Sequence, residues 1–594
     1  MGVLPPIADY GLLGDTRTAA LVSSAGALDW MCVPRFDGQS VFGRLVGGPA
    51  AGVFRMGPAG PARVVQRRYR DNSATLQTTW QVGGARLTLT ETMIAEVAGR
   101  LLPATLLVRR LSATGGEAEA AIEFDPRLGE EHRAPRVSRR GTDLVCAWGS
   151  LALSLGDDYG LDITPGQSHT ATVRPGHPLT TVLTLAYKEP LIHVGAQRAW
   201  QLLLEDEARW QRWCGQIDAD RPFRDAVVRS LLTLRLLTYS PSGAPVAAPT
   251  TSLPEHPGGI RNWDYRYAWP RDASIGVVAF LAVGKLEEAR GFLGWLLHAS
   301  RLQRPRLPAL LTIDGRHAPR ERTLAGWPGF RDSTPVRRGN GAADQHQLDG
   351  YGWVLDAAWA LVAAGHPLYS ETWRAMRAFA DLVARRWSEP DAGIWEIRAD
   401  AAHHVHSKVM GWLALDRALC IARTHRSSTR QRSRWTLARD AIGAEVRGRG
   451  FDPVLGSYTR TYGSTDLDAA LLILPLIGIE PRHSERMRGT IDAIRSALSA
   501  GGPLLYRYPP GRDGLPGEEG AFLPCSFWLV QALAATGRRE EATGLFEAML
   551  ERASPLGLFA EEMDPNTGAH LGNYPQALSH AALVQAALAL REAG

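Results

Sequence analysis

The sequence predicts two domains, an N-terminal antiparallel β-sandwich followed by an all-α (α/α)6 barrel. Short segments rich in Thr, Val and Leu fill about the first 200 residues, and helical spacing of apolar residues replaces them from about Ala199. Beyond Pro222 the helical segments come in six pairs. We therefore expect the β-sandwich over residues 1–200, a helical linker over 201–221 and the barrel over 222–594.

The strands of the β-sandwich are expected where Gly, Pro or charged residues bound short apolar segments. Their intervals suit antiparallel strands, and these segments are 75–82, 85–93, 101–111, 118–124 and 180–187.

The helices of the barrel are predicted from apolar spacing and from Gly and Pro breaks. The second member of each pair is the more apolar, as in GWLALDRALCIA and FWLVQALAA, and an apolar helix with little polar face must be buried on most sides. Six inner helices surrounded by six outer ones satisfy this requirement. The predicted helices are 222–239, 272–283, 285–302, 344–364, 370–387, 405–424, 430–448, 465–477, 482–499, 521–536, 537–552 and 577–592.

The loops before the inner helices contain most of the unusual polar residues. In such a barrel these loops share one end, so their side chains should converge on one cavity. Carboxylates, Arg, His and Trp interleaved there suit a neutral polyol such as a sugar. The alternative is that acidic residues, among them Asp272, Asp344 and Glu519, cap helix N-termini. The loops are 259–274, 337–350, 393–408, 459–468, 514–527 and 557–580.

Hydrolysis of a glycoside needs one protonated and one ionised carboxyl group on opposite sides of the bond. Glu396 follows Trp395 in GIWEIR, and a carboxyl group beside an indole should have a raised pKa, as an acid catalyst requires. The pattern alone does not select its partner. The loop candidates are Glu396, Glu518, Glu519, Glu561 and Glu562.

Charge and aromatic content add little about partners. The net charge is only +5, and the arginines are scattered rather than clustered, so no nucleic-acid partner is expected. The 18 Trp residues suit core packing or stacking on sugars, and composition does not choose between these uses.

Cysteine usage and the N-terminus suggest a cytoplasmic protein without membrane spans. The N-terminal residues lack a signal-peptide pattern, and no stretch approaches 18 consecutive apolar residues. The cysteines are odd in number and widely spaced, which argues against a disulfide framework and against a zinc site. They are Cys32, Cys146, Cys214, Cys420 and Cys525.

Four segments of the barrel resemble glycoside hydrolase family 15, the glucoamylase, glucodextranase and bacterial trehalase group. They are NWDYRYAWPRDAS, GIWEIR followed by HSKVMGWLALDRA, EEGAFLPCSFWLV, and GLFAEEMDPNTGAHLGNYPQALSH. The stretch from IADYGLLGDTRTAALV to FGRLVGG resembles the N-terminal β-domain of the bacterial trehalase-like members.

This resemblance implies the catalytic and substrate-binding residues. Glu396 matches the general acid, and Glu561 matches the general base of an inverting mechanism, with the two carboxyl groups about 6.5–9.5 Å apart. The Arg271–Asp272 pair matches the pair that binds the non-reducing glucose. The remaining expected substrate-binding residues are Trp269, Trp395, Gln347, Asp349, Lys408 and Glu562.

The sequence also departs from the family pattern. Ala560 replaces the usual Ser before the base, Met563 replaces the usual Tyr after Glu562, and Val405 replaces an aromatic residue. These changes affect the hydrogen bonding of the base and the outer sugar subsites, and they leave both catalytic carboxylates in place.

The resemblance favours α,α-trehalose as the substrate, with α-1,4- or α-1,6-gluco-oligosaccharides as the alternative. An inverting phosphorylase would need a phosphate site instead of a base, and a carbohydrate-binding protein would need neither carboxylate. No cofactor is expected, and His403, His404 and His406 lack the acidic partners of a metal site. A small carbohydrate is the only expected partner, and the oligomeric state stays open. The segment 29–38 of the N-terminal domain is the one expected to reach over the pocket.

Overall fold

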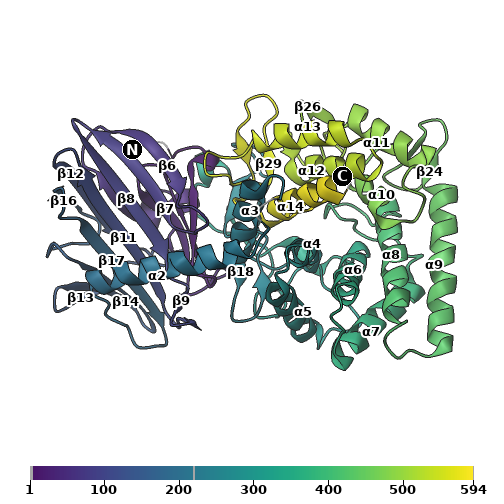
Figure 1. Ribbon diagram of the computed structural model, residues 1–594, viewed down its shortest axis with the longest axis horizontal. Coiled ribbons are helices and arrows are strands. Elements are labelled where there is room, and N and C mark those ends of the chain that lie inside the picture. Colours follow the sequence, from purple (N-terminus) through teal and green to yellow (C-terminus); the bar gives the residue numbers. More distant parts are fainter. Residues whose placement is uncertain (1–3, 219–220, 593–594) are drawn as a thin grey trace.

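The computed structural model describes residues 4–218 and 221–592 and contains the two predicted domains. A β-domain lies at one end of the molecule and a helical domain at the other (Figure 1). The prediction of an antiparallel β-domain followed by an (α/α)6 barrel is therefore confirmed.

The β-domain consists of two antiparallel sheets that pack against each other. The smaller sheet has the order β1 (Gly11–Gly14), β2 (Ala19–Val22), β3 (Ala27–Val33), β5 (Val53–Pro58), β12 (Ala118–Asp125) and β16 (Ser168–Val173), with β4 (Gln39–Phe42) beside β3. The larger sheet has the order β13 (Arg136–Arg140), β14 (Asp143–Trp148), β15 (Leu151–Asp157), β17 (Leu179–Tyr187), β11 (Thr105–Thr114), β8 (Ala85–Met93), β7 (Leu76–Val82) and β6 (Arg63–Tyr69).

A buried arginine joins the two sheets. Arg109 of β11 is fully buried, and its Nε lies 2.8 Å from Oε2 of Glu91 in β8. The other two nitrogens of the guanidinium donate to the carbonyls of Phe54 and Gly26 on the smaller sheet. Because all three guanidinium nitrogens have partners, these contacts offset the desolvation penalty of the buried charge and tie the larger sheet to the smaller one.

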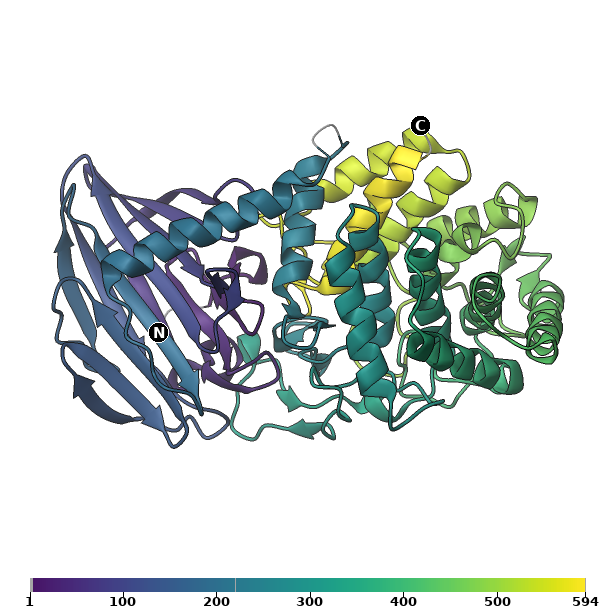
Figure 2. The same cartoon turned by 60° about the horizontal axis from the view of Figure 1, so that its bottom comes forward.

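Helix α2 (Ala196–Gly215) contacts the β-domain at its start and, through Trp213, helix α5 (Leu286–Ser300) of the helical domain near its end. Its residues Ala199, Leu202 and Leu203 form a small apolar cluster with side chains of the larger sheet. The helix then extends toward the helical domain (Figure 2). The predicted limit at residue 200 falls inside this helix, and we propose that the domain boundary lies after α2.

Six helical segments form the inner ring of the barrel, and each packs against the next until the last, α14, contacts the first, α4. Their apolar composition requires this burial. They are α4 (Pro270–Leu281), α6 (Asp349–Ala363), α8 (Val405–Ile421), the 3-10 helix η5 (Ala469–Ile473) continued by α10 (Leu474–Ile477), α12 (Leu523–Ala535) and α14 (Ala577–Glu592).

The outer helices alternate with the inner ones along the chain, as predicted. They are α3 (Arg224–Leu236), α5 (Leu286–Ser300), α7 (Ser370–Arg386), α9 (Thr429–Arg449), α11 (Glu485–Ala497) and α13 (Arg539–Leu550).

Two predicted inner helices differ from the expectation in length. The segment 465–477 forms a 3-10 helix and one short α-helix, and Pro475, which has no N–H to donate, stands near the start of the latter. The segment 344–364 becomes helical only at Asp349, because a separate 3-10 turn capped by Asn340 occupies residues 341–344.

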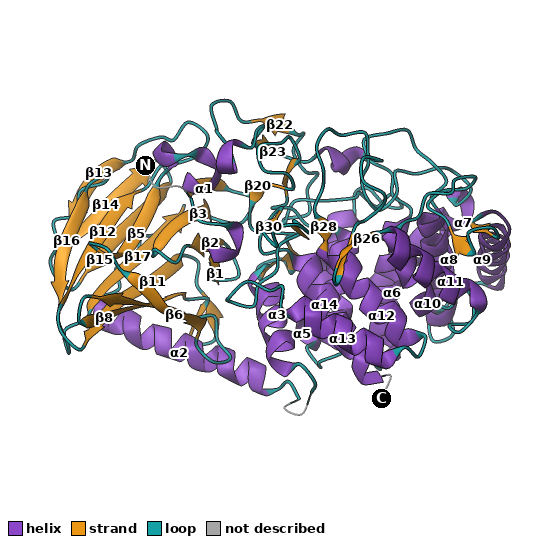
Figure 3. Ribbon diagram, turned by 90° about the horizontal axis from the view of Figure 1, so that it is seen from above, coloured by secondary structure: helices purple, strands orange, loops and turns teal. Residues whose placement is uncertain are grey.

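The loops that precede the inner helices gather with several short strands at one end of the barrel (Figure 3). In the described part of the chain, no helix has the length and apolarity needed to cross a membrane.

Candidate active site

Two adjoining cavities lie where the loops converge, and we call them the inner and the outer cavity. Tyr265, Trp395, Glu396 and Arg507 line both. The inner cavity is completed by Ala247, Trp269, Arg271, Asp272, Ile275, Ile394, Phe522, Trp528, Glu561, Gln576 and Leu578. The outer cavity is completed by Glu255, Arg261, Trp263, Asn340, Gly341, Ala342, Gln345, Ile397, Arg398, Tyr508, Asp513, Leu515 and Glu519.

Glu396 stands at the boundary between the two cavities, in the loop before α8. Its backbone is left-handed, with φ of 58°, which is uncommon for a residue with a side chain. Oε1 accepts hydrogen bonds from Trp269 Nε1 at 2.7 Å and from Gln347 Nε2 at 3.2 Å. Burial raises the pKa of this carboxyl group, while the nearby Arg271 guanidinium opposes the rise.

The Arg271–Asp272 pair lies in the first turn of α4 and faces the inner cavity. Arg271 Nε donates to Asp272 Oδ1 at 2.7 Å, and its Nη1 donates to the carbonyl of Ile394 at 2.9 Å. Nη1 also lies 3.5 Å from Oε1 of Glu396. One arginine therefore holds both an acidic neighbour and the loop that carries Glu396.

Glu561 faces the inner cavity from the segment just before β29 (Glu562–Met563). Its Oε1 accepts a hydrogen bond from the Tyr265 hydroxyl at 2.6 Å. Burial raises the pKa of this carboxyl group to about 7, against the lowering effect of Arg507 and Tyr265. Gly572 packs so closely that a Cβ there would lie 2.6 Å from Oε2, so a larger residue would displace the carboxylate.

Arg507 and Tyr265 line the cavities although neither is among the residues expected from the sequence, and Arg507 has the larger set of charged partners. It lines both cavities, and its Nη2 lies 2.9 Å from Glu519 Oε2, 3.0 Å from Glu562 Oε1 and 3.6 Å from Glu255 Oε2. Burial and mutual repulsion raise the pKa of Glu255 and of Glu562 well above the usual value. The available signal was the Tyr-Arg-Tyr run at 506–508, which lies outside the six loops.

Trp395 is fixed by the loop 459–468, which contributes no side chain to either cavity lining. Its Nε1 donates to Asp468 Oδ1 at 2.8 Å, and its ring packs edge-on against Phe522. Asp468 also caps the start of η5 through the backbone N–H of Ala470. Five of the six predicted loops therefore supply lining residues, and the sixth supports one of them.

Six of the expected site residues line the inner cavity: Glu396, Glu561, Arg271, Asp272, Trp269 and Trp395. Glu519 lines the outer cavity and takes part in the Arg507 network instead of capping a helix, whereas Glu518 is exposed.

The other four expected residues lie behind the cavity walls. Gln347 bonds to Glu396, as described. Asp349 is fully buried behind Arg271, and burial raises its pKa to about 7. Glu562 is also fully buried and pairs with Arg507 and with the N–H of Gly520.

Lys408 does not reach the cavities, and its expected contact with substrate has no support in its position. The side chain is fully buried, and its Nζ donates to the carbonyls of Trp387 at 2.6 Å and Glu389 at 2.5 Å. These residues follow α7, so the ammonium group caps the end of that helix.

Trp263 forms a wall of the outer cavity. Its Nε1 donates to Glu255 Oε1 at 2.9 Å, and the guanidinium carbons of Arg337 and Arg398 lie 4.9 and 4.6 Å from the ring centroid. Glu321 pairs with both guanidinium groups. The indole is therefore held by a hydrogen bond at its edge and by two cation–π contacts.

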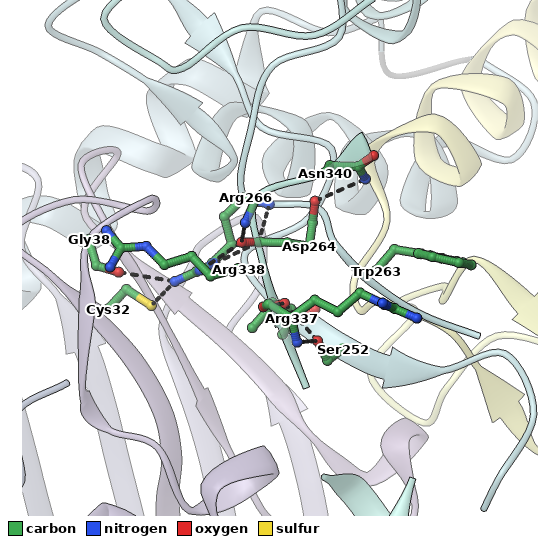
Figure 4. A network of polar contacts seen from close by, with 12 residues as sticks. Cys32, Gly38, Ser252, Trp263, Asp264, Arg266, Arg337, Arg338 and Asn340 are labelled. Atoms are coloured by element: carbon green, nitrogen blue, oxygen red, sulfur yellow. Dashed lines mark hydrogen bonds and ion pairs between the residues drawn. The ribbon is translucent and has the colours of Figure 1, made fainter. Parts of the chain in front are cut away.

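The segment 29–38 of the N-terminal domain lines neither cavity, contrary to the expectation that it reaches over the pocket. It contacts Arg266 from behind the outer cavity instead, through Cys32 and Gly38 (Figure 4).

No three His, Cys, Asp or Glu side chains within residues 4–218 and 221–592 are grouped so as to hold a metal ion. His403 stacks on Tyr462, and His406 is buried beneath Arg271, where burial and that positive charge lower its pKa to about 3.

Comparison with known proteins identifies the family of each domain. Residues 221–588 match the model of glycosyl hydrolases family 15, and residues 3–185 match that of the trehalase-like N-terminal domain. The chain is 36% identical to a trehalase of Mycolicibacterium smegmatis, over 98% of this chain and 91% of the relative. It is 32% identical to a trehalase of Thermoplasma volcanium, over 99% of this chain and 94% of the relative.

The fold is shared with a solved structure as well. A bacterial glucoamylase complexed with acarbose superposes with a TM-score of 0.72 at 14% identity, covering 99% of this chain and 95% of that one. The match of the family model over the whole barrel, together with these relatives, shows that the chain belongs to glycosyl hydrolase family 15.

Proposed function

We propose that the protein hydrolyses α,α-trehalose to glucose with inversion at the cleaved centre. The observation that carries this proposal is that Glu396 and Glu561 line one inner cavity. The named relatives are trehalases that match nearly the full chain, including the β-domain, and this supports trehalose over longer glucans.

The inner cavity suits the glucose residue whose bond is cleaved. Arg271 and Asp272 offer a donor and an acceptor for its hydroxyl groups, and Trp269 and Trp395 offer apolar surface for its ring. The second glucose of trehalose would occupy the outer cavity, which is lined by Trp263 and Arg398.

Glu396 is proposed as the general acid. It lies between the two cavities, where the glycosidic oxygen of a bound disaccharide would stand, and burial raises its pKa, which favours the protonated form that an acid catalyst needs. The donors Trp269 and Gln347 hold Oε1, which leaves Oε2 free to carry that proton.

Glu561 is proposed as the general base. It faces the inner cavity, which the Arg271–Asp272 pair also lines, and Tyr265 holds its Oε1, so the other carboxylate oxygen can accept a proton from an attacking water. Glu561 takes a proton from this water, whose oxygen attacks C1 as the C1–O bond breaks. The leaving oxygen receives the proton of Glu396.

This mechanism fixes the anomers of the two products. The attacked residue becomes β-glucose, whereas the leaving residue keeps its own C–O bond and is released as α-glucose. A phosphorylase would release a glucosyl phosphate instead. That reaction needs no general base, whereas the inner cavity contains Glu561 as a second carboxyl group, with Tyr265 hydrogen-bonded to it.

Proton NMR of a trehalose digest tests substrate and stereochemistry together. We expect α- and β-glucose in equal amounts before mutarotation, and turnover reduced about 10²–10⁴-fold in a Glu561→Gln sample run in parallel. Two α-glucose molecules per trehalose would contradict inversion. Hydrolysis of maltose or isomaltose in place of trehalose would contradict the proposed substrate.

A further inference from the structure

We propose that Arg266 is a positioning residue through which the N-terminal domain fixes the wall of the outer cavity and thereby sets the affinity for the leaving glucose. This inference rests on the proposed function. Arg266 and its partner Asp264 line neither cavity, so any effect on substrate must pass through the groups that they hold.

One end of the Arg266 side chain is bound by the N-terminal domain. Arg266 is 4% exposed, and its Nη1 donates to the carbonyl of Gly38 at 3.0 Å and to Cys32 Sγ at 3.3 Å (Figure 4). Cys32 lies in β3 of the smaller sheet. The contact therefore joins the sheet of one domain to a loop of the other.

The other side of the guanidinium forms a two-point pair with Asp264. Nε and Nη2 each lie 2.8 Å from a different oxygen of this fully buried carboxylate. Asp264 Oδ2 also accepts the N–H of Gly339 at 3.1 Å, and its carbonyl accepts Asn340 Nδ2 at 3.4 Å. Asn340 lines the outer cavity, so this pair fixes one part of the wall.

Asp264 fixes a second part of the wall through its own strand. The strand β21 (Asn262–Asp264) pairs with β20 (Thr251–Pro254), and successive side chains of a strand point to opposite faces. Asp264 therefore points toward the N-terminal domain while Trp263 points into the outer cavity. The guanidinium of Arg337 lies over the Trp263 ring, and the backbone N–H of Arg337 donates to the hydroxyl of Ser252 in β20.

These contacts predict an effect confined to the leaving group. Trp263 and Asn340 belong to the outer cavity alone, whereas Glu396 and Glu561 are held by Trp269, Gln347 and Tyr265. Tyr265 lies between Asp264 and Arg266 in the chain, but its backbone is bound separately by Thr250 and Ala248. A change at Arg266 should therefore weaken binding in the outer cavity more than it affects the chemistry in the inner cavity.

Two substrates separate these effects. By the proposed function, the two glucose units of trehalose occupy both cavities. α-Glucosyl fluoride has only one glucose unit, for the inner cavity, and its small fluoride leaving group does not depend on the outer cavity. Arg266→Lys keeps the charge but loses the two-point geometry. We expect it to raise KM for trehalose about 10-fold and to change kcat/KM for α-glucosyl fluoride less than about 2-fold.

Variants at Cys32 provide a milder test if Arg266→Lys does not fold. Cys32→Ala removes the sulfur acceptor, and we expect about a 3-fold rise in KM for trehalose. Cys32→Ser keeps an acceptor and should restore most of the loss. The matched control is Arg322→Gln, which removes an exposed ion pair between Arg322 and Glu130 of the N-terminal domain. It should behave as the wild type.

A parallel fall of kcat/KM for both substrates would overturn the inference, because it would indicate a general loss of structure. Unchanged kinetics in a folded Arg266→Lys variant and in Cys32→Ala would also overturn it. The wild type is assayed first, and failure to cleave trehalose would count against the proposed function alone. The comparison is then made with the disaccharide that the wild type does cleave.

Discussion

The backbone of Glu396 is held in a conformation that a glutamate seldom adopts. A left-handed residue with a side chain costs roughly 1–3 kcal/mol and persists only where surrounding contacts determine it. Here Trp269 and Gln347 bind its side chain, while Arg271 binds the carbonyl of Ile394 two residues earlier. The strain is thus balanced by the same groups that aim the carboxyl group at the boundary of the two cavities.

The roles of Glu396 and Glu561 can be distinguished by comparing two substrates whose leaving groups differ in their need for an acid. Glu561→Gln should lower kcat for both trehalose and α-glucosyl fluoride about 10²–10⁴-fold, because attack by water needs the base in either case. Glu396→Gln should lower turnover of trehalose as strongly but spare α-glucosyl fluoride, because fluoride departs without a strong acid. The exposed Glu518→Gln is the control, with melting temperatures measured throughout. Equal losses in Glu396→Gln on both substrates would remove it as the acid.

The pH profile should be bell-shaped, with an acidic limb set by Glu561. The base must be ionised, so activity should fall as the pH drops through the raised pKa of Glu561, at about 7. Tyr265 donates a hydrogen bond that favours the ionised form. Tyr265→Phe should therefore raise this pKa and move the acidic limb of kcat/KM to higher pH. A limb that stays in place or moves to lower pH would contradict the assignment.

Among the elements, α7 and α8 are joined by the buried ammonium group of Lys408. Lys408→Met should leave the carbonyls of Trp387 and Glu389 without their donor and lower the free energy of unfolding by about 1–3 kcal/mol. Urea unfolding measures this loss. KM for trehalose should stay within about 2-fold. A large rise in KM with unchanged stability would instead place Lys408 in substrate binding.

The helices were predictable from their apolar residues. An outer helix needs one apolar face toward the barrel, and an inner helix needs an almost entirely apolar surface. Each of the twelve predicted segments contains a helix, and the main errors lie at Pro475 and at the 3-10 turn before Asp349. These errors have local causes that apolar spacing does not register.

The site was predictable where motif residues reach the cavity directly, as Glu396, Glu561 and Arg271 do. Arg507 escaped because the sequence does not show that one guanidinium faces three carboxylates from separate loops. Lys408 was misplaced for a related reason, since a residue inside a motif can serve the helix rather than the ligand.

At the scale of the whole molecule, the two domains share one continuous apolar core that includes residues from Ile7 to Leu590. Hydrogen bonds such as Trp30 Nε1 to the carbonyl of Pro249, at 2.8 Å, cross the same boundary. The domains therefore have little reason to unfold separately.

We expect a single cooperative transition on heating, with the near-ultraviolet signal of the tryptophans and the far-ultraviolet signal of the helices changing together. Scanning calorimetry and circular dichroism on the full chain measure this. Two resolved transitions would contradict the shared core. A catalytic domain that folds alone with the same melting temperature would contradict it as well.

The hydroxyl of Tyr574, in the segment between Glu561 and α14, donates to the carbonyl of Tyr10, 564 residues earlier in the chain. This contact can form only once residues 10–574 have all been synthesised, which at about 5–20 residues per second takes roughly 30–110 s. Strand β1 pairs with the adjacent β2, so folding of the β-domain can begin long before this contact forms. The junction between the two domains is therefore completed late, when the segment before α14 has been added.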